Sequence, residues 1–304
     1  MRSMVFSRHW CFLSAFLAGI SVASSATPLA CGFAGASLTL SHAAAVDFES
    51  GPGSMAVSDI VFSAPLGGPI ALHDSLMMIP SLGIRSSVLG FEKIPTSVID
   101  STPRDLTVFP MAFRLSDALI YQPGDSRWTH GFLATGKLAS DLREITSEDF
   151  GGEFGIFSVY QISDRLSIGG TFGMSVSEND NQFRPGLCLD WSIRDDLDLH
   201  LAGADWSLRY APDDRRSLSL RGYTTNEIWS MLDQAGETLT LKLGSYRIGC
   251  FYEQQLTENI SLTLGAGCTL NNRVRLDDMF GATVVNARLD HGPFVECGLT
   301  ITTW

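Results

Sequence analysis

The sequence lacks the long apolar runs that cross a membrane as helices. After residue 26 it contains no apolar stretch of about 18 residues, the length from which a transmembrane helix is suspected. A sustained helical period is missing as well. These two absences exclude helical membrane proteins and helical bundles.

Positive charge is scarce. The 304 residues include 21 Lys and Arg against 33 Asp and Glu, a formal net charge of −12. Residues 1–26 hold two arginines and no acids, so the remainder carries 19 minus 33, or −14. Nucleic-acid binding needs a basic face that neutralises phosphates. The composition therefore excludes a nucleic-acid partner.

Recognisable motifs for chemistry are missing too. There is no G-x-S-x-G, H-E-x-x-H, phosphate-binding loop or dinucleotide glycine fingerprint. We therefore expect no catalytic residues, no cofactor and no metal site. One enzymatic alternative stays open, because some outer-membrane barrels are hydrolases with a Ser/His/acid group. The residues near enough in sequence to form one are His200, Asp198, Ser192 and Ser207.

Cysteines are few, and none form a C-x-x-C pair. The five that follow residue 26 are scattered and odd in number (Cys31, Cys188, Cys250, Cys268 and Cys297), so a disulfide framework is not indicated. Cys268 and Cys297 fall on segments that we expect to be neighbouring strands. Two alternatives are open for them: a disulfide in an oxidising compartment, or two small apolar fillers.

The first residues form an export signal. Arg2 and Arg8 precede an apolar run from Trp10 to Val22, and small residues follow at 24–26, the arrangement of a secretory signal peptide. We assign residues 1–26 to the signal and 27–304 to one mature domain. Cleavage after Ala45 is an alternative.

One sequence pattern recurs along the mature chain. QISDRLSIGG (161–170) is repeated in form by SIRDDLDLHLAG (192–203), YAPDDRRSLSLRG (210–222) and QQLTENISLTLGAG (254–267). Each copy has a polar corner, apolar residues at every second position, and glycine at the end. Alternation with period two predicts strands joined by tight turns.

The alternation continues over most of the chain, so the predicted fold class is all-β. Strands are expected near 37–48, 55–64, 76–89, 105–116, 127–138, 153–163, 165–176, 183–193, 196–203, 206–211, 216–224, 238–255, 260–269 and 292–303. Short corners alternate with long polar segments at 139–152, 177–182, 225–237 and 270–291, as in an antiparallel up-and-down transmembrane barrel. The count is fourteen strands, with twelve as the alternative, and fourteen puts both termini at the short-turn end.

Alternation alone does not separate a membrane barrel from a secreted sandwich. The export signal, lipid-type residues in one phase with aromatics near strand ends, and glycine, serine and threonine in the other phase favour the barrel. Closure also removes the strand edges that lipid cannot satisfy. We predict an integral protein of the bacterial outer membrane, with long loops outside and termini in the periplasm.

The repeated segments belong to longer stretches of sequence that follow one another in a characteristic order. DFESGPGSMAVSDIVFSAPL (47–66), WTHGFLATGKLASDLREITSEDF (128–150), YQISDRLSIGGTFGMS (160–175) and LDLHLAGADWSLRYAPDDRRSLSLRGY (197–223) resemble an outer-membrane β-barrel family of unknown function from Gram-negative bacteria. The resemblance covers roughly residues 47–270 and implies fold and location. It transfers no catalytic residue.

A set of charged residues falls in the phase predicted to face inward. Facing lipid at the midplane would cost about 2–4 kcal/mol for such a charge, so we predict that they line the lumen. The set is Arg184, Asp190, Asp198, His200, Arg209, Arg221, Lys242 and Glu296. Two alternatives follow: a narrow passive channel for small solutes, or a structural barrel whose charges pair and occlude the lumen.

The chain ends in GPFVECGLTITTW, with an aromatic terminal residue as is common in outer-membrane barrels. Trp304 is one step out of phase with Val295, Cys297, Leu299 and Ile301, which a bulge or a place in the interfacial aromatic belt would explain. We predict that Trp304 is an assembly signal for the barrel-insertion machinery. The expected partners are this machinery and outer-membrane lipids, and the oligomeric state is left open.

Overall fold

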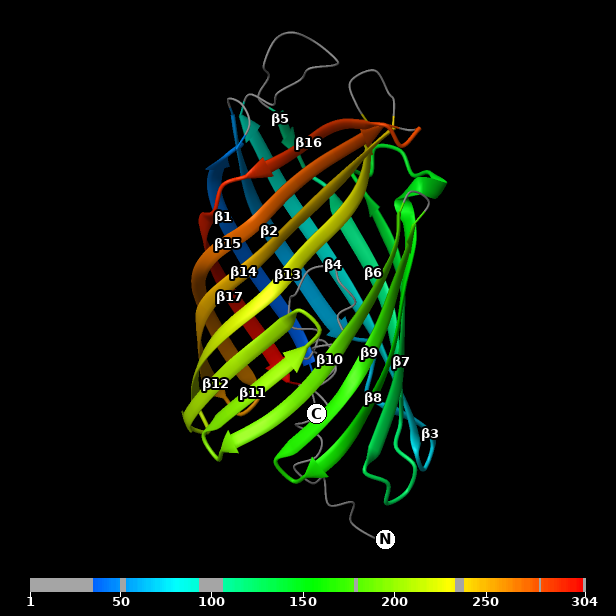
Figure 1. The fold of residues 1–304 in the computed structure, drawn as a ribbon, viewed down its shortest axis with the longest axis vertical. Coiled ribbons are helices and arrows are strands. Elements are labelled where there is room, and N and C mark those ends of the chain that lie inside the picture. The colour runs from blue at the N-terminus through cyan, green and yellow to red at the C-terminus, as the bar shows by residue number, and fades with distance from the viewer. Residues whose placement is uncertain are drawn as a thin grey trace.

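The protein is a closed antiparallel β-barrel of fourteen strands (Figure 1). It is described from a computed structural model, which covers residues 35–49, 53–92, 106–177, 180–232, 238–278 and 280–302. The expected all-β, up-and-down architecture is confirmed. Residues 1–26, predicted to be a signal peptide, and Trp304 lie outside the described residues. The described residues include no helix long and apolar enough to cross a membrane.

Fourteen strands make the wall, and three short ones extend it. The wall strands are β1 (Gly35–Asp47), β2 (Ser54–Pro65), β4 (Leu76–Glu92), β6 (Met111–Tyr121), β7 (Trp128–Ser140), β8 (Phe150–Ser163), β9 (Leu166–Ser177), β10 (Asp180–Arg194), β11 (Leu197–Ala202), β12 (Asp205–Asp213), β13 (Arg216–Leu232), β14 (Thr238–Thr257), β15 (Ile260–Asp278) and β17 (Gly292–Thr302). The short strands are β3 (Ile70–His73), β5 (Leu106–Val108) and β16 (Thr283–Leu289), and one 3-10 turn is η1 (Ser147–Asp149).

Pairing between the first and last strands closes the barrel. β1 and β17 are antiparallel, with a register that runs from Gly35 opposite Thr302 to Ala43 opposite Phe294. All other wall strands pair with their neighbours in sequence. The short strands prolong existing pairs, since β5 follows β6 on β4 and β16 follows β17 on β15. Among the described residues two features depart from this regularity: the short β11–β12 hairpin, and a single parallel bridge between Ser230 of β13 and Ser140 of β7.

The distribution of polarity is the reverse of that in a water-soluble protein. Large apolar side chains lie exposed on the outer face, among them Leu40, Ile60, Leu115, Ile156, Ile168, Phe172, Leu187, Leu218, Leu264 and Val295. Charged side chains such as Asp59, Arg85 and Glu227 are buried inside. The period-two alternation therefore separates an apolar exterior from a polar interior, as in barrels that face lipid.

Aromatic residues gather on the outer face close to the short turns. Trp128, Tyr160, Tyr210 and Tyr252 all lie within a few residues of such a turn, and the Trp128 and Tyr160 ring centroids are 5.0 Å apart. Aromatic rings with one polar atom favour the membrane–water interface. This ring of aromatics marks one edge of the apolar band.

Two segments predicted as long polar loops are largely strand. β13 continues to Leu232, through most of the predicted loop 225–237, and β15 and β16 occupy much of 270–291. Polar residues in TNEIWSML suggested a loop, yet Glu227 and Trp229 point inward in a regular strand. A polar residue in the inward phase is compatible with strand, and the loop prediction ignored this.

The neighbouring-strand prediction for Cys268 and Cys297 is correct, but they form no disulfide. β15 pairs with β17, and the register sets Cys297 opposite Leu264 and Cys268 opposite Pro293. The two thiols are thus four positions apart along the ladder. Both cysteines are free, and Cys297 is exposed on the outer face.

Candidate functional site

The middle of the lumen is crossed by a network of ion pairs centred on Glu227 of β13. Its carboxylate accepts hydrogen bonds from three cations on other strands: Arg85 Nη1 of β4 at 2.9 Å, Arg114 Nη2 of β6 at 2.6 Å, and Lys137 Nζ of β7 at 2.9 Å. β13 is thereby joined to β4 and β6, which are not its neighbours in the sheet, and to β7, which it also meets at one parallel bridge. We use the name lumen network for these four residues together with Asp59, Ser87 and Arg247, which are described next.

Asp59 of β2 extends the network toward the barrel seam. Arg85 binds it through two nitrogens, Nη2 at 2.8 Å and Nε at 3.2 Å, a bidentate geometry that fixes both side chains. Ser87 Oγ donates to the same carboxylate at 2.7 Å. Arg247 of β14 lies at 3.5 Å from it. One guanidinium, Arg85, therefore joins both carboxylates.

The network is buried and carries excess positive charge. The side chains of Asp59 and Glu227 are 2% exposed and that of Arg85 is 6% exposed. Four cations (Arg85, Arg114, Lys137, Arg247) face two carboxylates, so the set sums to +4 − 2 = +2. The whole chain is acidic, at −12. The lumen network is therefore cationic, whereas the chain as a whole is acidic.

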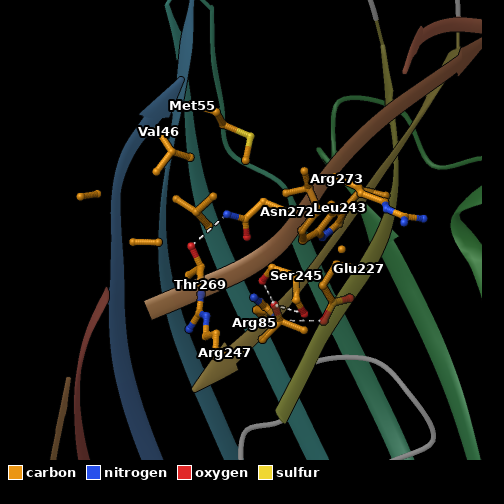
Figure 2. A pocket seen from close by; sticks show the side chains of 16 residues that line it. Val46, Met55, Arg85, Glu227, Leu243, Ser245, Arg247, Thr269, Asn272 and Arg273 are labelled. Atoms are coloured by element: carbon orange, nitrogen blue, oxygen red, sulfur yellow. Dashed lines mark hydrogen bonds and ion pairs between the residues drawn. The ribbon is translucent and has the colours of Figure 1, made fainter. Parts of the chain in front are cut away.

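A small cavity lies against the network (Figure 2). It is about 50 Å³ and extends between β1 and β2 on one side and β13, β14 and β15 on the other. Arg85, Glu227 and Arg247 line it, together with Trp229. Two donors of this lining, Trp229 Nε1 and Arg247 Nε, are therefore buried beside the cavity without a hydrogen-bond partner among the described residues.

An aromatic cluster narrows the lumen beside the network. Tyr223, Phe251 and Phe294 are buried with ring centroids 6.2–6.4 Å apart. The Arg221 guanidinium lies 4.7 Å from the centroid of Phe251, within cation–π range. Tyr223 donates its hydroxyl proton to Glu296 at 2.9 Å. Filled space and paired charge together constrict this level.

His200 is joined to an acid but to no serine. Its Nδ1 is hydrogen-bonded to Asp190, whereas Ser192 donates to Asp198 at 2.8 Å. His200 Nε2 is buried without a partner among the described residues. A serine nucleophile would have to bond this nitrogen. The arrangement that the enzymatic alternative requires is therefore not assembled in this structure.

The structure distributes the predicted lumen residues over the barrel. Arg184, Asp190, Asp198, His200, Arg209, Arg221 and Glu296 lie in the inward phase. Asp198 and Arg209 are half-exposed, 3.9 Å apart, near the short turns.

The prediction that Lys242 lines the lumen is wrong. The β13–β14 register is unbroken from Arg216 to Leu232, so Lys242 shares the outward phase of Tyr252. Its Nζ contacts Asp277 at 3.3 Å on the outside of the barrel, near the loop end.

Sequence reasoning missed every member of the lumen network. Around Asp59 and Arg85 the strands carry apolar residues in both phases (Met55 and Val57 inward, Ile60 outward), so the inward phase was hidden. Glu227 was assigned to a loop. The available signal was an isolated charge in an otherwise apolar strand, as in MAVSDIVF and SLGIRSSV. Such a charge needs a partner inside the barrel.

The model of a family described as Domain of unknown function (DUF6268) matches residues 120–301. No curated protein matches the chain. Solved structures with similar folds include an outer-membrane channel from Pseudomonas putida F1 (10% identity, 87% of this chain and 94% of that chain, TM-score 0.43). Others are the toluene transporter TodX of Pseudomonas putida (11%, 91% and 92%, 0.41) and a Pseudomonas aeruginosa FadL homologue (11%, 94% and 96%, 0.38).

Proposed function

The chain belongs to the DUF6268 family, and we propose that it is a passive, non-enzymatic channel of the bacterial outer membrane. Small solutes pass along a lumen narrowed by the lumen network, and anions pass more readily than cations. The observation that carries the proposal is the inverted polarity of a closed barrel, with apolar side chains outside and buried charges inside.

The outer face supports insertion in a bilayer. An apolar band about 25 Å tall, bordered by aromatics, is what lipid requires of a barrel. Trp128, Tyr210 and Tyr252 form such a border at the short-turn end. In bacterial barrels the short turns face the periplasm. The described ends Gly35 and Thr302, paired at the seam, are then periplasmic, and the long loops are outside.

The sign of the lumen network supports selection for anions. A narrow passage between low-dielectric walls concentrates ions of the opposite sign, and the network sums to +2. Arg85 and Arg247 line the cavity, so an anion there would lie beside two guanidinium groups. Small anionic solutes are the class that this lining accommodates.

Two experiments test membrane insertion and conduction. The folded protein should be recovered in the outer-membrane fraction and should migrate differently in boiled and unboiled gel samples. In planar bilayers it should give discrete conductance steps, and under a KCl gradient the reversal potential should indicate that chloride permeates better than potassium. Recovery as a soluble periplasmic protein would overturn the membrane proposal.

A matched pair of variants locates the selectivity. Lys137→Gln removes one charge from the lumen network, so the preference for chloride should fall. Lys242→Gln makes the same change on the outer face and should leave selectivity unaltered. Equal effects of the two substitutions would assign selectivity to the surface charge.

The two alternatives have their own outcomes in these experiments. Folded protein without conductance steps would favour a structural barrel with an occluded lumen, held shut by the buried pairs around Glu227. Turnover of phospholipid or lipid A that disappears in His200→Ala would favour an enzyme. Neither outcome is expected.

Outer-membrane lipids and the barrel-insertion machinery are the proposed partners, with Trp304 as the assembly signal. Deleting Trp304 should lower the inserted fraction more than deleting one residue from 233–237, a control chosen between β13 and β14. Membrane fractionation of both variants measures this. Equal insertion would mean that Trp304 carries no assembly information.

A further inference from the structure

The barrel wall is incomplete above the β11–β12 hairpin. These strands turn at Gly203, part-way up the wall, while β10 and β13 continue past them on either side (Figure 1). β10 pairs with β11 from Cys188 downward, and β13 pairs with β12 only as far as Gly222. Among the described residues no backbone pairing joins β10 to β13. We call the stretch between residues 181–187 and 224–230 the wall gap.

The β10 border of the gap has the chemistry of a strand edge. The Gly203 N–H donates to the Leu187 carbonyl at 2.8 Å, which fixes the direction in which odd-numbered backbone groups of β10 point. Pro185 has the same parity, so its ring nitrogen, which has no proton, faces the gap. Proline is confined to edges because it cannot donate to a ladder. The sequence itself therefore prevents complete pairing here.

The β13 border exposes backbone groups of even-numbered residues. The Asp205 carboxylate accepts the Thr224 N–H at 2.9 Å and ends the hairpin side of the gap. At the far end the Ser230 carbonyl accepts the Asp141 N–H at 3.2 Å. Between these two points Asn226 and Ile228 face the gap without a ladder partner among the described residues. The gap is thus bounded above and below.

The two faces of the gap differ in chemistry. Phe183, Pro185 and Leu187 are exposed on its outer rim, and the first and last are 64% and 68% exposed. On the inner side lie Arg184 and Thr225, which belong to the inward phase and are partly buried. Apolar groups therefore meet polar and cationic groups across the thickness of one wall.

The lower part of the gap lies at the depth of the bilayer. Leu187 is eight residues from Asp195 in the turn below, and a rise of about 3.3 Å per residue at about 40° of tilt gives a height of about 20 Å. The apolar band of a barrel is about 25 Å tall. Backbone groups facing lipid must find a partner, so whatever occupies the gap must accept hydrogen bonds.

We propose that the wall gap is a lateral site for a single-chain amphiphile with an anionic head. Its acyl chain lies against Phe183 and Leu187, and its carboxylate accepts the N–H groups of Asn226 and Ile228 on the side of the positively charged lumen. This inference rests on the proposed function, because it gives the proposed channel a substrate class and a lateral exit toward lipid. Binding at the wall gap does not require conduction along the barrel axis, so failure of the lateral site and failure of the channel can be told apart.

The test is quenching inside the barrel by a lipid-phase probe. Full-length protein in liposomes carries bimane at Thr225→Cys, beside the gap, or at Thr135→Cys, inward on the fully paired strand β7. The quencher is stearic acid with a nitroxide on its chain. Quenching at position 225 should exceed that at position 135 at least threefold.

Three further variants decide the origin of the excess quenching at position 225. Phe183→Asp, which puts a like charge on the rim, should reduce the excess, whereas Phe172→Asp, on the outer face of the fully paired β9, should not. Lengthening the hairpin by four alternating residues after Gly203 should remove the excess. Equal quenching at positions 225 and 135, or an excess that persists in Phe183→Asp, overturns the proposal whether or not the lengthened hairpin folds.

Discussion

The two borders of β13 are held in different ways. Toward β14 the strand is paired over its entire length, from Arg216 to Leu232. Toward β12 the pairing ends at Gly222. Above that point the strand is held by Glu227, which reaches across the lumen, and by Ser230, which touches β7. Buried ion pairs here take over the role that backbone hydrogen bonds have elsewhere in the wall.

The largest effect should come from removing the charge that holds the incomplete border. In Glu227→Gln the cations Arg85, Arg114 and Lys137 lose their shared carboxylate charge. Removing one partner of a buried pair costs about 3–5 kcal/mol, and the free energy of unfolding in urea, measured in lipid vesicles, should fall by that order. Glu253→Gln is the control.

The control breaks a weak pair at the paired border. Glu253 lies 3.9 Å from Arg221 and is half-exposed, and such pairs contribute about 0–1 kcal/mol. If Glu227→Gln is no worse than Glu253→Gln, β13 does not depend on the lumen network.

An intermediate effect is expected where the hairpin tip meets β10. A Cβ atom on Gly186 would lie 2.8 Å from the Gly203 Cα, whereas one on Gly136 of β7 would meet nothing within 4 Å. Overpacking against backbone costs about 1–3 kcal/mol. Gly186→Ala should therefore lower the unfolding midpoint, and Gly136→Ala should not. Identical midpoints would mean that the tip moves freely.

The smallest effect concerns the bonds that fix the hairpin from outside. Tyr246 Oη accepts from Trp206 Nε1 at 2.9 Å and donates to the Ala204 carbonyl at 3.1 Å. Tyr246→Phe should cost about 1 kcal/mol. Tyr252→Phe removes a hydroxyl of an exposed residue that bonds only Gln254 among the described residues, and this change should cost less. The same unfolding curves measure both, and a reversed order would contradict the role of Tyr246.

The contrast between the two borders also explains what the sequence could predict. In strands such as Leu166–Ser177, mostly apolar residues alternate with serine, threonine and glycine, and strands and turns follow from this pattern. Farther up, Trp229 and Met231 point inward and are as apolar as the outer face. Alternation of polarity disappears there, so strand and loop were confused.

The lumen network could not be predicted for a different reason. Glu227 and its three cationic partners are 90 to 142 residues apart in sequence, and only the closure of the barrel brings them together. Strand number and register, which decide that closure, are set by many weak pairings. The Asp190–His200 pair was accessible, because the two strands are consecutive.

Hydrogen exchange of single β13 amides tests the central claim most directly. In the wild-type protein in bilayers, the amides of Glu227 and Trp229, which face β14, should be protected. Those of Asn226 and Ile228, which face the wall gap, should exchange at least a hundredfold faster, and should slow when an anionic amphiphile is added. Equal protection of all four amides without amphiphile would mean that the wall is complete, and would contradict this account.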